Sequence, residues 1–157
     1  MNMNNYMKLT ISAIGCNEGF ARSTVAAFAL PLNPTLSEFS DIKTAVSEAV
    51  TNAVVHAYEK ESEENTVTIE CETQFSGEGA DCFGILHIRI SDNGCGIEDI
   101  GKALQPFYTT RGDEERSGMG FTIMQTFMNG FRVESEKGVG TTIIMSKKIG
   151  IKDGGNA

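Results

Sequence analysis

The sequence lacks the segments that mark a membrane protein or an exported protein. None of its apolar runs approaches the roughly 18 residues that a membrane span needs. The stretch from Met1 to Met7 is rich in asparagine and has neither the basic block nor the apolar block of a signal peptide. We therefore expect a cytoplasmic protein that does not associate with a membrane.

Cysteine and histidine are scarce. The chain has 157 residues, of which 4 are cysteines and 2 are histidines, and no two cysteines form a Cys-x-x-Cys pair. This set does not predict a zinc site. In a reducing compartment we expect free thiols, most of them buried. The four residues are Cys16, Cys71, Cys82 and Cys95.

Basic residues are too few for a nucleic-acid surface. Lysine and arginine total 13 against 21 aspartates and glutamates, and the formal net charge is -8. Contacts to phosphates in nucleic acid need clustered basic side chains, so we expect no direct contact with nucleic acid. The charge leaves a protein partner open, and a basic surface on that partner would be attracted.

The sequence does contain a regular succession of helical and strand-like segments, in a length that suits one domain at 1–157. We expect an ordered core at about 6–148. Helical spacing covers 20–30, 37–58, 97–104 and 118–129. Strand-like alternation covers 6–14, 66–75, 83–91, 131–135 and 141–147. This order predicts an α+β fold, a two-layer sandwich with helices on one face of a mostly antiparallel mixed sheet whose first strand lies at an edge.

The helix predicted at 37–58 carries polar residues at intervals of four. Glu48, Asn52 and His56 therefore lie along one helical face, beside an apolar stripe. The side-chain oxygen of Asn52 is suited to bind Mg²⁺ beside phosphates. Glu48 is suited to accept a proton from a hydroxyl group. Taken alone, the pattern favours an ordinary amphipathic helix with a polar shoulder.

A second candidate follows the strand predicted at 83–91. Asp92 is in phase with the apolar residues of that strand, which predicts that its carboxylate points toward the interior. A buried carboxylate needs a hydrogen-bond partner, and an adenine amino group is one such partner. Gly94 and Gly96 would give a flat base room. On its own, Asn-Gly at this point favours a hairpin turn.

Two glycines mark the start of the helix predicted at 118–129. Gly118 and Gly120 flank Met119, and free backbone N–H groups at a helix start suit a phosphate. The polar loop at 106–117 that precedes them has the composition of a mobile lid. It contains Thr109, Thr110 and Arg116. An ordinary capped turn explains the glycine pair equally well.

The last candidate enters the strand predicted at 141–147. Thr141 shares the inward phase of Ile143 and Met145, so its hydroxyl is expected beside Asp92. Alone, the segment is a glycine-rich turn before a strand.

In this order, the four segments resemble the signature of the Bergerat-fold ATPases, which include gyrase, the heat-shock chaperone, the mismatch-repair ATPase and histidine kinases. The signature runs Glu-x-x-x-Asn on a helix, Asp-x-Gly-x-Gly after a strand, a lid, a Gly-x-Gly helix start, then Gly-Thr on a strand. The ordered set is far more specific than any one segment. The resemblance implies that the chain binds ATP or ADP, with Mg²⁺.

A closer resemblance covers residues 7–145. The stretches TVAAFALPLNPT, IKTAVSEAVTNAVVHAY and ERSGMGFTIMQTFM are similar to the sporulation anti-sigma F factors, a family of serine kinases. This resemblance implies a homodimer that inhibits a sigma factor of the F type and phosphorylates a serine of an anti-anti-sigma factor. The chain departs from the family pattern at 74–82, where its hairpin is longer.

The resemblance also implies roles for residues that bind the nucleotide. Asp92 would bind adenine, helped by Thr141 and Thr142, and Asn52 would hold Mg²⁺. The backbone N–H groups near the glycine pair would contact the phosphates, and the lid threonines would complete the site. These backbone and lid residues are Gly118, Met119, Gly120, Thr109 and Thr110.

For the chemistry, the resemblance implies that Glu48 takes the proton from the partner's serine and that Arg116 stabilises charge on the transferred phosphoryl group. His56 is interpreted as structural or pocket-lining. Arg22 is a candidate partner contact, and a solvated arginine explains it as well. Two alternative functions stay open: a binding module that uses nucleotide only as a switch, and a general-stress anti-sigma kinase.

Overall fold

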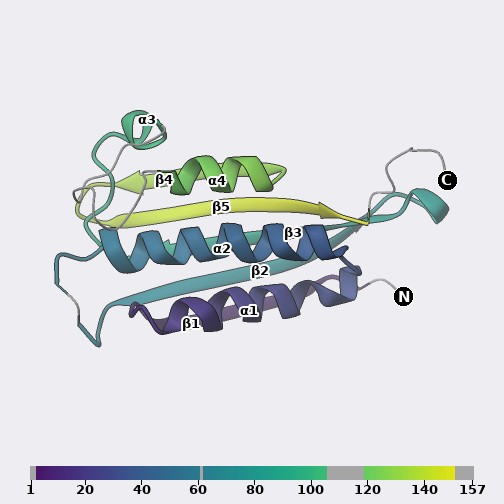
Figure 1. The fold of residues 1–157 in the computed structure, drawn as a ribbon, viewed down its shortest axis with the longest axis horizontal. Coiled ribbons are helices and arrows are strands. Elements are labelled where there is room, and N and C mark those ends of the chain that lie inside the picture. Colours follow the sequence, from purple (N-terminus) through teal and green to yellow (C-terminus); the bar gives the residue numbers. More distant parts are fainter. Residues whose placement is uncertain (1–2, 61, 106–118, 151–157) are drawn as a thin grey trace.

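A computed structural model describes residues 3–60, 62–105 and 119–150 of the chain. One five-stranded sheet carries a layer of helices (Figure 1). The strands are β1 (Asn5–Ser12), β2 (Thr66–Ser76), β3 (Phe83–Asp92), β4 (Gly130–Glu136) and β5 (Gly140–Ile149). Their order in space is β1-β2-β3-β5-β4, so the first strand lies at an edge as predicted.

Every strand pairing among these residues is antiparallel. The α+β prediction is confirmed, whereas the described part of the chain shows no parallel pair of the kind a mixed sheet requires. The hairpin of β2 and β3 stays paired out to Ser76 and Phe83. A short 3-10 helix, η2 (Gly79–Asp81), closes it.

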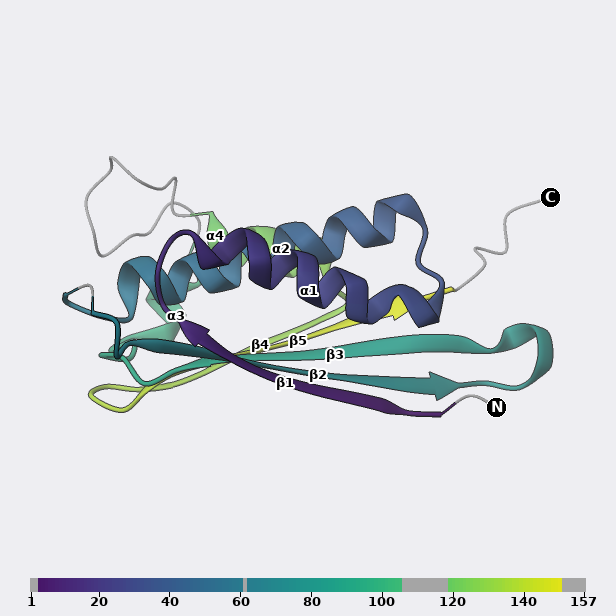
Figure 2. The ribbon, with the colours of Figure 1, turned by 90° about the horizontal axis from the view of Figure 1, so that it is seen from below.

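Helices α1 (Asn17–Ala29), α2 (Leu36–His56) and α4 (Gly120–Phe127) lie together on one face of the sheet, as Figure 2 shows. The short helices η1 (Leu30–Leu32) and α3 (Ile100–Ala103) complete the set of described helices with η2. The helix predicted at 97–104 is shorter because it begins only after Asp99, whose carboxylate accepts a hydrogen bond from Lys102 N–H. None of the described helices combines the length and the apolar character that crossing a membrane requires.

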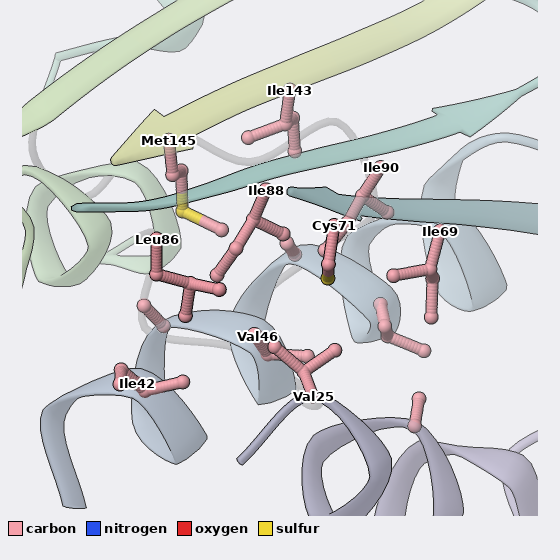
Figure 3. Packing of buried hydrophobic residues seen from close by; sticks show 14 of the residues in the cluster. Val25, Ile42, Val46, Ile69, Cys71, Leu86, Ile88, Ile90, Ile143 and Met145 are labelled. Carbon is pink, nitrogen blue, oxygen red and sulfur yellow. The ribbon is translucent and has the colours of Figure 1, made fainter. Parts of the chain in front are cut away.

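The core lies between the helices and the sheet (Figure 3). One stripe of α2 is fully or almost fully buried, and it consists of Ile42, Ala45, Val46, Ala49, Val50 and Ala53. Alternate residues of the strands meet this stripe, among them Ile69, Ile88 and Met145. Because the apolar stripe is turned to the sheet, the polar shoulder of α2 is left beside the core.

The cysteines differ in their surroundings. Cys71 is buried, and burial raises the pKa of its thiol to about 12. Cys82 is half-buried, while Cys16 and Cys95 are exposed, so the prediction that most thiols are buried is wrong. Within the described ranges, no group of three or more His, Cys, Asp and Glu side chains is placed to hold a metal ion.

Candidate functional site

The polar shoulder of α2 meets the start of α4. Glu48 and Asn52 lie one turn apart on α2, and both residues are half-buried. A Cβ placed on Gly120, the first residue of α4, would lie 3.2 Å from Glu48 Oε2 and 3.4 Å from Asn52 Oδ1. The two helices therefore bring a carboxylate, an amide and a glycine helix start together.

This junction has the chemistry of a phosphate site. Met119 is the N-cap of α4, and its side chain makes no capping hydrogen bond. The first N–H groups of a helix have no partner within the helix, and they attract anions. A side chain at Gly120 would press on the Glu48 carboxylate and the Asn52 amide, so the glycine keeps this space open.

Asp92 ends β3 on the sheet face that carries the helices. Its register partners are Val67 on β2, which is fully buried, and Thr141 on β5. This placement agrees with the inward phase expected from the sequence. Asp92 Oδ1 accepts hydrogen bonds from Gly94 N–H at 3.0 Å and from Thr141 N–H at 3.2 Å. Burial raises the pKa of the Asp92 carboxyl, and these two hydrogen bonds oppose the rise.

The other carboxylate oxygen of Asp92 is open to a ligand. Among the described residues, no hydrogen bond reaches Oδ2. No buried side-chain oxygen in the same ranges lacks a partner, so Oδ2 is accessible. A half-buried acceptor of this kind fits a donor such as an amino group on a flat base.

The glycine loop after β3 packs against the backbone of the chain itself. A Cβ on Gly94 would lie 2.0 Å from the Ala57 carbonyl oxygen, and one on Gly96 would lie 2.2 Å from the Glu136 carbonyl oxygen. Cys95 N–H donates to the Ala57 carbonyl at 2.6 Å. The two glycines thus let the loop approach the end of α2 and the end of β4, a requirement separate from the room for a base expected from the sequence.

Thr141 and Thr142 point to opposite faces of the sheet because side chains alternate along a strand. Thr141 pairs with Asp92 on the face that carries the helices, and its hydroxyl lies 2.8 Å from Ser135 Oγ. Thr142 pairs with Ser91, and their hydroxyls lie 3.1 Å apart on the open face. The structure therefore brings Thr141 to Asp92 and places Thr142 away from it.

Comparisons with known proteins identify the family of the chain. Residues 18–147 match the family model of the histidine kinase-like ATPase domain. The anti-sigma F factor of Clostridium botulinum is 52% identical over 147 residues, which cover 94% of this chain and 96% of that protein. The chain belongs to the anti-sigma F factor family. Another member, from Caldanaerobacter subterraneus, is 50% identical over 150 residues, covering 96% of this chain and 98% of that protein.

A solved structure shows the same fold. The RsbU and RsbW domains of a Mycobacterium tuberculosis protein align with a TM-score of 0.62 at 16% identity, over 92% of this chain and 32% of that chain. For this anti-sigma F family member, the ATPase domain implies that the chain binds nucleotide. Asp92, Asn52 and Gly120 are the described residues whose surroundings fit that ligand.

Several residues singled out in the sequence lie outside the described residues. They are Thr109, Thr110, Arg116 and Gly118, together with the segment predicted as a lid at 106–117. Arg22 is described: it lies on α1, where its Nη1 is 3.0 Å from Glu18 Oε1. His56 is the last residue of α2, and its carbonyl oxygen accepts from the Cys95 thiol at 3.4 Å.

Two residues that support the site were missed in the sequence. Tyr58 OH donates to the Thr66 carbonyl at 2.6 Å and accepts from Asn93 N–H at 3.2 Å. Ser135 Oγ accepts from Ile97 N–H at 2.7 Å. Both residues join segments that are distant along the chain, so no local spacing could have indicated them.

Proposed function

We propose that this protein is an anti-sigma factor and a protein serine kinase that uses Mg-ATP. The observation that supports the proposal most directly is the junction of α2 and α4, where Glu48 and Asn52 face Gly120. Asp92, with one carboxylate oxygen open, supplies the second half of a nucleotide site. The membership in the anti-sigma F factor family gives the biological context.

At the adenine end, Asp92 Oδ2 accepts a hydrogen bond from the amino group of the base. The two backbone N–H groups on Oδ1 hold the carboxylate in place for this contact. The Thr141 hydroxyl, which is held by Ser135, is the neighbouring polar group. Such an assembly orients the base before binding, which reduces the entropy lost on association.

At the phosphate end, Asn52 provides an oxygen ligand for Mg²⁺. Backbone N–H groups of Met119 and Gly120 donate to phosphate oxygens. Gly118 and the predicted lid residues Thr109 and Thr110 are proposed to donate there as well. Mg-ATP, when bound, would supply the γ-phosphoryl group and leave as ADP. Glu48 accepts the proton of the attacking serine hydroxyl, and Arg116 stabilises the charge that develops on the transferred group.

The family membership supports a proposal about the partners. A sigma factor of the F type is the protein that the chain inhibits, and an anti-anti-sigma factor is both its antagonist and the source of the phosphorylated serine. The chain acts as a homodimer, and bound ATP or ADP sets which partner it holds. Regulation of transcription during sporulation is the resulting role.

The test is phosphate transfer from Mg-ATP to the purified anti-anti-sigma factor, followed by intact mass. Glu48→Gln keeps the shape of the side chain and removes the base, so the rate should fall about 10²–10⁴-fold while ATP still binds. Glu78→Gln, at an exposed position in the β2–β3 hairpin, is the matched control and should leave the rate unchanged.

The outcomes separate the candidate functions. A phosphoserine on the anti-anti-sigma factor that is lost in Glu48→Gln supports the kinase and the base. Confirmed ATP binding without any transfer would instead favour a nucleotide-switched binding module. Transfer to the antagonist of a stress-response sigma factor, with none to the sporulation antagonist, would favour a general-stress kinase.

A further inference from the structure

A groove lies between α1 and α2, which run side by side on the sheet (Figures 1 and 2). Its volume is about 360 Å³. Two cationic side chains line it, Arg22 from α1 and Lys43 from α2. The lining also contains one carboxylate, that of Glu48, so cations outnumber anions in this groove of a chain whose formal net charge is -8.

The groove runs to the residue proposed as the base. Its α2 wall includes Ser40, Lys43, Thr44, Ser47 and Glu48. Successive turns of the helix contribute Ser40, then Lys43 and Thr44, then Ser47 and Glu48, so these residues form one broad face with Lys43 and Glu48 at its two edges. Glu48 therefore belongs both to this groove and to the junction with α4. A peptide segment in the groove would reach Glu48 directly.

The two cations differ in how they are paired. Arg22 is 3.0 Å from Glu18, whose carboxylate also accepts a hydrogen bond from the Ser47 hydroxyl. Lys43 forms no ion pair with any described carboxylate, and its Nζ lies 5.6 Å from the ring centroid of Phe39. The ring holds the ammonium group at the groove without neutralising it. Lys43 is thus the charge that is available to a ligand.

The position of Lys43 separates it from the nucleotide. Along α2, Asn52 follows Glu48, and the end of the helix beyond Asn52 contacts the glycine loop next to Asp92. Lys43 precedes Glu48 by five residues, which is about 7.5 Å along a helix axis. The anion that reaches Lys43 therefore comes from the side opposite the nucleotide site.

We infer that Lys43 binds a carboxylate of the protein substrate, two or three residues away from the serine that Glu48 deprotonates. An extended chain advances about 3.3 Å per residue, so roughly two residues cover the separation along the helix. This inference rests on the proposed kinase function. It adds a specificity-determining residue and states the charge and position of the substrate side chain that it recognises.

The experiment compares steady-state phosphate transfer to the anti-anti-sigma factor by wild-type, Lys43→Glu, Lys43→Gln and Lys148→Glu chains. Lys148 is exposed near the end of β5 and serves as the matched charge control. For Lys43→Glu, we expect the KM for the protein substrate to rise about tenfold, because a repulsive contact replaces an attractive one. The kcat and the KM for ATP should stay within twofold of wild type. Lys43→Gln should show a smaller rise.

A charge swap identifies the carboxylate. Mass spectrometry locates the phosphorylated serine, and each acidic residue within three positions of it is changed to lysine. One such substrate should lose affinity for the wild-type chain and regain it with Lys43→Glu. Raised salt should increase the KM of the wild-type chain for the protein substrate more than it increases the KM of Lys43→Gln, since salt screens a charge contact.

The failures are distinguishable. Transfer by the wild-type chain with equal KM values for Lys43→Glu and Lys148→Glu would overturn the inference and leave the kinase function standing. A rise confined to the KM for ATP would overturn it as well, because Lys43 would then act on the nucleotide. No transfer by the wild-type chain would contradict the kinase function itself, and the inference would fall with it.

Discussion

The two ends of α2 are held in different ways. At the N-terminal end, Thr35 and Glu38 form a capping box, with N–H groups donating to Thr35 Oγ1 at 3.1 Å and to Glu38 Oε2 at 3.2 Å. At the C-terminal end, the Ala57 carbonyl accepts from Cys95 N–H at 2.6 Å. The first set of bonds lies within one turn of the chain, while the second joins segments 38 residues apart.

This difference separates stability from function along one helix. A capping box completes the helix with local partners, so a change there alters the helix and little else. The contact at Ala57 fixes the glycine loop, and the Gly94 N–H of that loop holds the Asp92 carboxylate. The C-terminal end of α2 is therefore part of the proposed nucleotide site.

The largest effect is expected for Gly94→Ala. The added Cβ would lie 2.0 Å from the Ala57 oxygen and 2.5 Å from its carbonyl carbon. Backbone atoms cannot rotate away, so the loop and the helix end must separate, at a cost of about 3 kcal/mol of unfolding free energy. We also expect weaker nucleotide binding, because the Asp92 carboxylate loses its support. Urea denaturation and fluorescent-nucleotide titration measure the two effects.

The matched control is Gly101→Ala in α3. A Cβ there would meet only Asp99 Oδ1 at 3.5 Å, which is an ordinary contact. This variant should be neutral or stabilised by up to about 1 kcal/mol, as alanine is favoured over glycine in a helix. Equal stability for Gly94→Ala and Gly101→Ala would contradict the close packing of the loop on α2.

Asp92→Asn tests the contacts at the C-terminal end of α2 without the backbone clash that Gly94→Ala introduces. The asparagine Oδ1 can still accept from the Gly94 and Thr141 N–H groups, whereas its NH₂ group replaces the oxygen proposed to accept from adenine. Losing a hydrogen bond to a charged group costs about 1.5–3 kcal/mol, or roughly 10- to 150-fold in Kd. We expect this loss in ATP titrations, with unfolding free energy without nucleotide equal to wild type or higher.

The pH dependence of the unfolding free energy, compared between wild type and Asp92→Asn, gives an independent check. Burial raises the pKa of Asp92 in the folded chain, so the folded state favours the protonated carboxyl. The contribution of Asp92 to stability is then largest in acid, and it is lost as pH rises through the raised pKa. Between about pH 3 and pH 7, the unfolding free energy of wild type should fall relative to Asp92→Asn. A difference that rises with pH would contradict the burial of this carboxylate.

Periodicity was enough to predict most of the fold and the phase of two site residues. The stripe on α2 and the alternation on β3 and β5 placed Asp92 and Thr141 on the face that carries the helices. The same alternation, applied strictly, would also have placed Thr142 on the opposite face. The Thr-x-x-Glu pattern at Thr35 is typical of a capping box and indicates a helix start at Leu36, where α2 begins. The prediction from apolar spacing alone starts the helix at residue 37.

The remaining features depend on tertiary contacts. The helix predicted to end near Tyr58 ends at His56. The Ala57 carbonyl accepts a hydrogen bond from Cys95 N–H, and hydrogen bonds of the Tyr58 hydroxyl join β2 to the glycine loop. Neither contact follows from local spacing, since each needs a partner from a distant segment. The sequence therefore predicts the glycine loop as part of a nucleotide site but does not show what the glycines pack against.

The smallest effect is expected for a change in the capping box at the N-terminal end of α2. Thr35→Ala removes the hydrogen bond from Glu38 N–H to Thr35 Oγ1, although the N–H of residue 35 can still donate to Glu38 Oε2. The substitution should lower the unfolding free energy by about 1 kcal/mol. Thr24→Ala on α1 is the control, because its exposed hydroxyl bonds only to the Phe20 carbonyl one turn back. We expect unchanged ATP affinity in both variants. Weaker ATP binding in Thr35→Ala alone would show that α2 transmits changes from its cap to the nucleotide site, and the separation of the two ends would then be wrong.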